Sequence, residues 1–210
     1  MLFTMRTSRA LMIGLLLFLV VQSPLAVERG QAAVAVLGED YSLYDRVIED
    51  KFLTSQIQLV LLDRMTVSRL MPQQDGSMTM DVFQQRGYFD GLLPQDLVRD
   101  FVGANQSPTR LEDRLQFGVR YRFVSEGIDE GSEAGAALLV MTHPPVPVQA
   151  PAVLDRLAFS RVGRTLKNDQ ALVYVENRRR DGTGAGFLVW FHRQGQEWEL
   201  FDTEVVWTMR

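Results

Sequence analysis

Three consecutive arginines, Arg178, Arg179 and Arg180, stand beside a run of glycines in the stretch NRRRDGTGAG at residues 177–186. Guanidinium groups bind carboxylates and phosphates through paired hydrogen bonds, and a glycine-rich loop can place backbone N–H groups around a phosphate. Such a loop needs a strand before it and a helix after it. Residues 186–193, GFLVWFHR, instead have the aromatic and β-branched composition of a strand. The pattern therefore favours a hairpin turn, with an anion or partner contact at the three arginines as the alternative.

Catalytic and metal chemistry have few candidate residues in this chain. It has no cysteine and two histidines, His143 and His192. Without thiols, and without two histidines at the spacing of a metal-binding helix, we expect no metal ion and no cofactor. No Gly-x-Ser-x-Gly motif marks a serine nucleophile. We name no catalytic residue, and a hydrolase assembled from scattered acids and His192 stays open as an alternative.

Trp190 and Trp207 lie in the apolar C-terminal stretches, near Phe187, Phe191 and Phe201. Indole rings can stack on a sugar or another flat ligand. Aromatic residues at alternating strand positions are also typical of the buried face of a sheet. We favour core packing for most of them, with Trp190 and Trp207 as candidates for ligand stacking.

Residues 1–35 have the features of a secretory signal peptide. Arg6 and Arg9 precede an unbroken apolar run, LMIGLLLFLVV at residues 11–21, and small residues follow it. A helix of that length rises about 17 Å, which is short of a hydrocarbon core about 30 Å thick. We expect cleavage between residues 26 and 35 and a periplasmic or secreted product. The alternative is an uncleaved N-terminus that anchors the chain to the inner membrane.

Apolar spacing also predicts the elements of the first half of the chain. The predicted elements are helices at 39–53 and 94–105 and strands at 57–67 and 117–124. Phe117 and Phe123 fall on one face of the last strand, whereas Arg120 falls on the other. Thr109, three residues before Glu112, has the spacing of a capping box and predicts a further helix start.

A proline-rich stretch at residues 143–151, HPPVPVQAP, is typical of an extended connector, because proline suits neither a helix interior nor a central strand. Beyond it the predicted strands are 156–164, 171–177, 186–193 and 197–207, joined by short polar turns. The predicted fold class is α+β, with N-terminal helices packed on a mainly antiparallel sheet that ends in a four-strand meander. We expect residues 36–210 to form one exported domain.

The C-terminal segment resembles a segment of uncharacterised bacterial exported proteins. The resemblance rests on Ser-Arg-Val-Gly at residues 160–163, Ala-Leu-Val-Tyr-Val at 171–175, the glycines at 184–186 and Trp198. It covers about the last quarter of the chain, and Arg164 stands where an aromatic residue is expected. The resemblance implies export and an antiparallel sheet, but it implies no activity and no site residues.

These patterns together favour a non-catalytic protein of the cell envelope that binds a partner protein or a small ligand with one face of its sheet. The formal net charge of −4 repels polyanions, so we expect no nucleic-acid partner. A membrane is expected as a partner only if the N-terminal apolar run is retained. In that case the chain would be a membrane-anchored accessory subunit.

Overall fold

The computed structural model of this chain describes residues 35–125, 128–129, 152–179 and 181–210. All of them belong to the unit Ala33–Arg210. The predicted signal peptide apart from Ala35, the connector at 143–151, His143 and Arg180 lie outside the described residues. Cleavage and the extent of the exported domain therefore stay predictions.

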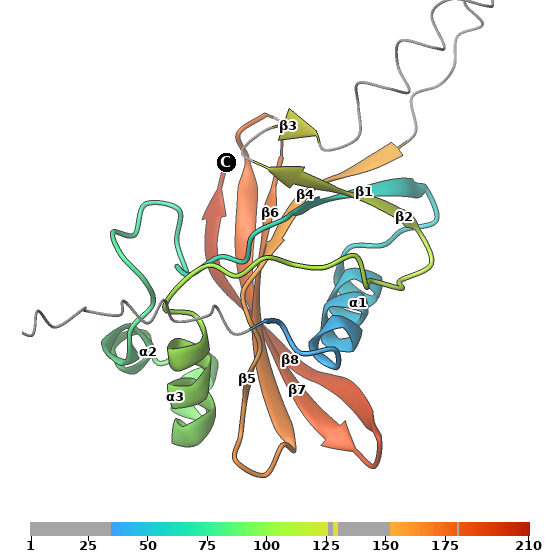
Figure 1. Ribbon diagram of the computed structural model, residues 1–210. Helices are drawn as coiled ribbons and strands as arrows, with labels where there is room; N and C mark the ends of the chain where they lie inside the picture. The colour runs from blue at the N-terminus through green and yellow to red at the C-terminus, as the bar shows by residue number, and fades with distance from the viewer. Residues whose placement is uncertain (1–34, 126–127, 130–151, 180) are drawn as a thin grey trace, which may run out of the picture. The chain divides into compact units, whose positions relative to one another are not determined.

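A mixed β-sheet forms the centre of this unit (Figure 1). Its strands are β1 Ile57–Asp63, β2 Arg120–Ser125, β3 Ile128–Asp129, β4 Ala152–Phe159, β5 Gly163–Arg164, β6 Gln170–Arg178, β7 Gly184–Gln194 and β8 Glu197–Met209. The helices are α1 Asp40–Lys51, α2 Met80–Arg86, α3 Gln95–Ala104 and the short turn η1 Tyr88–Gly91. Neighbouring strands follow the order β3-β2-β1-β4-β6-β7-β8, and β5 pairs with β6.

The C-terminal strands β4, β6, β7 and β8 form an antiparallel meander, as predicted. The predicted strand 156–164 is wrong in one respect, because residues 160–162 interrupt it and divide it between β4 and β5. β1, in contrast, runs parallel to both β2 and β4. Parallel neighbours that follow one another in the chain need a long crossover, and α2, η1 and α3 all lie in the connection from β1 to β2. The α+β class and a mostly antiparallel sheet are confirmed, whereas the sequence pattern did not predict the two parallel pairs.

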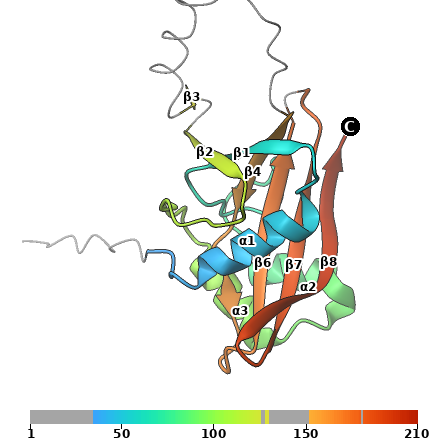
Figure 2. The same cartoon turned by 90° about the vertical axis from the view of Figure 1, so that its right-hand side faces the viewer.

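Helices cover both faces of the meander (Figures 1 and 2). α1 packs on one face, where it shares a buried cluster with Val173 and Val189. α2, η1 and α3 pack on the other face, in a cluster with Leu172 and Trp190. Because both faces of β6 are covered, six consecutive residues of that strand are buried, which explains its unbroken apolar run. Over β6 and β7, neither face of the sheet is free to serve as the expected binding surface.

Most predicted elements of the first half agree with the structure. α1 and α3 lie within the two predicted helices, and β1 begins at the predicted residue but ends at Asp63. The helix start predicted at Thr109 is wrong. The Thr109 carbonyl accepts the Thr66 N–H at 2.9 Å, and the Leu111 N–H donates to the Arg64 carbonyl at 2.8 Å. This segment is extended because its backbone pairs with the chain that follows β1, which a local capping pattern cannot reveal.

Candidate functional site

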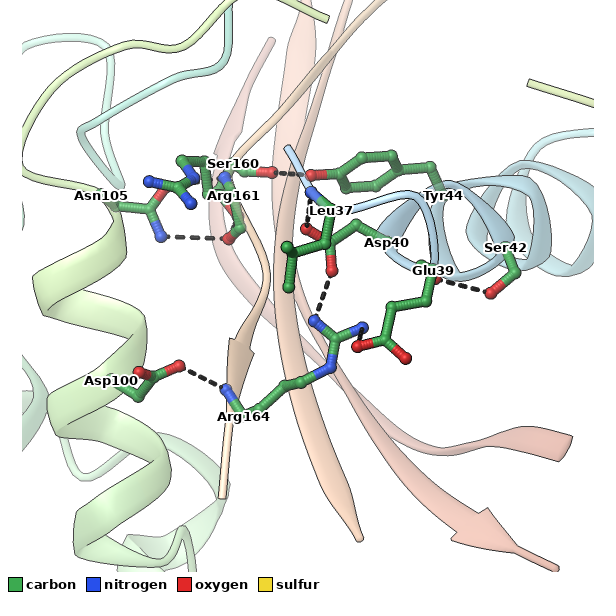
Figure 3. Close-up of polar contacts among 10 residues, drawn as sticks. All are labelled: Leu37, Glu39, Asp40, Ser42, Tyr44, Asp100, Asn105, Ser160, Arg161 and Arg164. Carbon is green, nitrogen blue, oxygen red and sulfur yellow. Dashed lines mark hydrogen bonds and ion pairs between the residues drawn. The ribbon is translucent and has the colours of Figure 1, made fainter. Parts of the chain in front are cut away.

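Residues 160–162 form a junction between β4 and β5, where the ladder with β6 is interrupted, and Gly163 of the Ser-Arg-Val-Gly stretch begins β5. Ser160 stays attached to β6, since its N–H donates to the Tyr174 carbonyl and its hydroxyl accepts the Tyr174 N–H, both at 2.8 Å. The Ser160 carbonyl accepts the hydroxyl of Tyr44 from α1 at 3.0 Å (Figure 3). The serine side chain thus takes the place of a ladder carbonyl, and the freed carbonyl ties α1 to the sheet.

Asn105 at the end of α3 binds the same junction from the other side. Its amide oxygen accepts the Arg161 N–H at 2.7 Å, and its amide nitrogen donates to the Arg161 carbonyl at 3.0 Å and to the Phe101 carbonyl at 2.8 Å. Asn105 is 1% exposed. The buried amide thus supplies hydrogen-bond partners to backbone groups of the interrupted strand and of the last turn of the helix.

Two carboxylates of α3 continue this pattern along the strand. Asp100 accepts the Arg164 N–H at 2.8 Å, and Asp96 accepts the Leu166 N–H at 3.0 Å. The Leu166 N–H lowers the pKa of Asp96, because that hydrogen bond favours the charged form. Side chains of α3 therefore take the place of a second neighbouring strand for residues 161–166, of which Gly163 and Arg164 pair with β6 on their other side.

Gly163 lets α3 lie directly against this strand segment. A Cβ atom at residue 163 would stand 2.4 Å from the Cβ of Phe101, a distance at which something must shift. Gly163 and Phe101 are both buried. The glycine of the Ser-Arg-Val-Gly stretch is thus required by close packing of a helix on a strand.

Arg164 connects the junction to the start of α1 (Figure 3). Its guanidinium donates to the Asp40 carboxylate, and another of its nitrogens lies 3.6 Å from a Glu39 oxygen. Burial raises the pKa of Asp40, and the Arg164 guanidinium opposes that rise. The guanidinium also lies 5.8 Å from the ring centroid of Trp198. Arg164, which departs from the expected aromatic, therefore forms a largely buried ion pair between α1 and the sheet.

An open cleft of about 610 Å³ lies among the start of α1, α3 and residues 161–166. The charged residues that line it are Asp40, Asp96, Arg99, Asp100, Arg161 and Arg164. The three aspartates are already engaged, since Asp40 binds Arg164 and the other two accept backbone N–H groups. The polar groups of this cleft hold the layers together and do not assemble a nucleophile with a base.

A second concavity, which we call the α2–α3 pocket, has a different character. Its volume is about 290 Å³, near the lower end of the roughly 300–1,000 Å³ typical of small-molecule sites. Its lining residues are Met80, Phe83, Gln84, Gly87, Tyr88, Gly91, Leu93, Gln95, Val98 and Arg99. Most of the wall is apolar or aromatic, and the Phe83 and Tyr88 rings lie 5.4 Å apart, edge to face. This is the usual composition of a site for a small organic ligand.

One wall of the α2–α3 pocket is formed by Gly87, Tyr88 and Gly91 of a left-handed turn, whose strained residues Phe89 and Asp90 do not line the pocket themselves. The φ angles are 62° at Gly87, 54° at Phe89, 56° at Asp90 and 75° at Gly91. For a bulky residue such as Phe89 this conformation is unusual and costs on the order of 1–3 kcal/mol. The Phe89 N–H donates to the Glu204 carboxylate of β8, which helps to hold the turn. Strain of this kind concentrates at functional sites.

Polar groups at the α2–α3 pocket are few. Burial raises the pKa of Tyr88, Arg86 opposes that rise, and Glu204 adds to it. Gln84 and Arg99 are exposed residues that line the pocket, and Gln95 begins α3 beside them. Sequence reasoning did not nominate any of these residues. The signal that could have found them is the stretch GYFDG at 87–91, with two glycines around an aromatic pair.

The predicted arginine site is divided by the fold. Arg178 ends β6, where its guanidinium binds the fully buried Glu176 and its backbone is paired with Arg156 of β4. Arg179 is in the turn, since its N–H donates to the Thr183 carbonyl at 2.9 Å and its carbonyl accepts the Gly182 N–H at 3.2 Å. The hairpin interpretation is confirmed, because β6 and β7 flank this turn. An anion contact there stays a prediction, with Arg178 already engaged by a carboxylate.

The two candidate stacking residues lie on the same face of the sheet as the α2–α3 pocket. Trp190 is 6% exposed and contacts Phe89, with ring centroids 5.5 Å apart. Trp207 donates from its indole nitrogen to the Tyr174 hydroxyl at 2.6 Å. A Cβ at Gly186 would stand 2.2 Å from that nitrogen, so the glycine makes room for the ring. Both indoles therefore have packing roles, and Trp190 stands behind the strained turn.

The groups of the hydrolase alternative are not brought together by hydrogen bonds in the described part of the chain. His192 stacks on Phe201, with ring centroids 3.9 Å apart, and no hydrogen bond joins it to a described carboxylate. Burial raises the pKa of Asp45 to about 6, yet this carboxylate accepts the Gln116 N–H at 2.9 Å and fastens that segment to α1. Among the described residues, no three His, Asp or Glu side chains are grouped to hold a metal ion.

No protein family, curated protein or solved structure compared with this chain matches it. The resemblance of its C-terminal segment to bacterial exported proteins therefore stays a prediction. Over the ranges that the structure describes, no helix has the length and apolar character needed to cross a bilayer.

Replacing Gly163 by alanine should lower the free energy of unfolding by about 1–3 kcal/mol, because the added methyl group overlaps Phe101. Gly103, in the same helix as Phe101, is the matched control, since a Cβ there meets nothing within 4 Å. Gly103→Ala should stabilise by about 0.5–1 kcal/mol through higher helix propensity. Urea unfolding followed by circular dichroism measures both. Equal effects of the two changes would contradict the close contact.

Asp40→Asn should cost up to about 3–5 kcal/mol, because it leaves the largely buried Arg164 with only the more distant carboxylate of Glu39. The double variant Asp40→Asn with Arg164→Met should lose less, since it removes the stranded charge. Asp50→Asn breaks the exposed pair with Arg46 in the same helix and should cost less than about 1 kcal/mol. Chemical denaturation of the original protein and its variants measures the free energy of unfolding and tests this order of losses. Additive losses from the substitutions at residues 40 and 164 would show that the two side chains are not coupled.

Proposed function

We propose that this chain is an exported, non-catalytic binding protein that holds a small amphipathic ligand in the α2–α3 pocket. The observation that carries the proposal is the combination of a mostly apolar pocket of about 290 Å³ with a strained wall. A left-handed turn containing Phe89 and Asp90 is costly, and strain of this kind is found more often at functional sites. A role in forming a ligand-binding site would account for this strained turn.

The lining indicates what kind of ligand fits. Phe83, Val98 and Leu93 offer an apolar interior for an aliphatic or aromatic body. The exposed Arg99 lines the pocket, helps to lower the pKa of Asp96 through its charge, and offers a guanidinium to an anionic head group. Guanidinium groups pair well with carboxylates. We therefore propose a small organic acid with an apolar tail.

The strained wall is supported from the sheet side, which favours a preformed site. Glu204 of β8 accepts the Phe89 N–H, and Trp190 of β7 packs against the Phe89 ring at 5.5 Å. A pocket whose wall is already fixed loses little conformational entropy when a ligand enters. The proposal therefore rests on a rigid receptor and needs no reacting group.

Octanoate, an eight-carbon acid, is the first probe for the α2–α3 pocket, with octanol as its uncharged counterpart. Isothermal titration calorimetry should show saturable binding of octanoate at a stoichiometry near one. Arg99→Gln should weaken octanoate about tenfold and leave octanol nearly unchanged, because the charge pair is lost. Lys51→Gln, at the exposed end of α1, is the charge-matched control and should change neither affinity.

Leu93→Trp should weaken both probes by about tenfold or more, because the larger side chain occupies the α2–α3 pocket. The adjacent Leu92 is 71% exposed and does not line the pocket, so Leu92→Trp should bind as the original protein does. Octanoate binding that both tryptophan variants retain would place the ligand elsewhere. Failure of the unaltered protein to bind either probe would overturn the proposed function.

Export is supported by the charged, apolar and small-residue segments of residues 1–35. Expression with the natural N-terminus, followed by cell fractionation and intact mass spectrometry, should yield a soluble species shortened at a position between residues 26 and 35. Arg6→Glu with Arg9→Glu should reduce processing, because the positive segment directs insertion. A full-length species in the membrane fraction would show an anchor instead of a cleaved signal peptide.

A further inference from the structure

β8 is the strand at one edge of the sheet, and among the described strands it pairs with β7 alone. It runs from Glu197 to Met209, which makes it longer than any other described strand. An edge strand presents backbone N–H and C=O groups to which an additional strand can bind. The edge is therefore a surface on which a second chain could continue the sheet.

The side chains of β8 combine exposed apolar groups with acids. Phe201 is 57% exposed, Val205 52% and Met209 37%. The acids of the strand are Glu197, Glu199, Asp202 and Glu204, and no lysine or arginine stands between residues 197 and 209. Glu199 and Glu204 have partners in Gln194 and the Phe89 N–H, and the exposed Asp202 accepts the N–H of the adjacent Thr203 at 2.7 Å. Glu197 is also exposed. The surface is apolar and negatively charged at once.

We propose that β8 binds an extended segment of a partner protein in which basic residues alternate with apolar ones. Such a segment matches the edge in hydrogen bonding, places apolar side chains beside Val205 on one face, and meets Asp202 on the other face with opposite charge. A second copy of this chain fits poorly, because pairing two β8 strands brings two acidic, base-free edges together. No residue of β8 lines the α2–α3 pocket, although Glu204 helps to hold the turn that forms one of its walls.

Two register irregularities limit how a partner can pair with β8. They lie opposite the steps Gly186/Phe187 and Trp190/Phe191 of β7 and leave a regular stretch from Asp202 to Val205 between them. Bulges of this kind are a common protection of edge strands against indiscriminate pairing. A partner strand can therefore pair regularly with this short stretch, and beyond it the partner has to follow the irregularities of β8.

A fluorescein-labelled peptide with four Lys-Val repeats is the probe, and fluorescence anisotropy is the measurement. We expect saturable binding to the full chain and none for four Lys-Pro repeats, which carry the same charge but cannot donate backbone hydrogen bonds from proline. Four Glu-Val repeats should not bind. The double variant Glu197→Lys with Asp202→Lys should weaken the Lys-Val peptide at least about tenfold.

The matched control is Asp75→Lys with Asp81→Lys, which changes the net charge equally at two exposed residues away from β8. It should alter peptide affinity less than about twofold. If both double variants lost the same affinity for the Lys-Val peptide, or if the Lys-Pro peptide bound, the binding would be due to general charge attraction. Either result would overturn the proposal. A dimer in sedimentation experiments that excludes the peptide would assign the edge to a second copy. Octanoate binding by the β8 variant, measured in parallel, separates this result from the proposed function.

Discussion

The pairing of the Asn105 side-chain amide with the backbone of Arg161 is the contact on which the arrangement of the layers depends. A strand that leaves its ladder exposes an N–H and a carbonyl that must find partners when they are buried. Asn105 supplies both partners and at the same time closes the last turn of α3. The position of α3 on the sheet follows from this contact. α2 and η1 share the buried cluster of α3, so the α2–α3 pocket depends on the same interaction.

The same short segment also fixes the opposite layer. The Ser160 carbonyl accepts the Tyr44 hydroxyl, and Arg164 binds Asp40 at the beginning of α1. Helices on the two faces of the sheet are thus both attached to residues 160–166. A buried ion pair contributes little net stability when its desolvation is counted, but it disfavours other placements of α1 because each of these would strand a charge. The junction specifies which packing is adopted more than it adds to stability.

Local patterns in the sequence were sufficient for α1, α3 and the meander, because each is set by residues close together in the chain. The hairpin at residues 178–184 followed from its turn composition and from the strand after it. The parallel pairs of β1 could not be predicted this way, since they depend on contacts across a long connection. The helix start predicted at Thr109 was wrong for the same reason, because the Thr109 N–H donates to the hydroxyl of Thr66, which is distant in sequence.

The candidate site was the least predictable part. The α2–α3 pocket gathers residues from α2, η1 and α3, and its one local mark is the glycine-flanked pair Tyr88 and Phe89. Arg178 and Trp190 could be identified from the sequence as residues able to bind a ligand, but their contacts with Glu176 and Phe89 depend on the sheet and on the turn. The residue types indicate which ligands each side chain could bind. Which side chains already bind one another depends on the fold and could not be predicted from the sequence.

The junction has a consequence for how distant relatives of this chain can be recognised. Its contacts join residues far apart in sequence, with separations of 116 positions from Tyr44 to Ser160 and 56 from Asn105 to Arg161. Each has a chemical reason for its identity: a hydroxyl at Tyr44, an amide at Asn105, and the absence of a side chain at Gly163. A spaced signature of tyrosine, asparagine and Ser-x-x-Gly, at these separations, is therefore a more discriminating query than overall similarity, since the surrounding apolar positions can interchange freely.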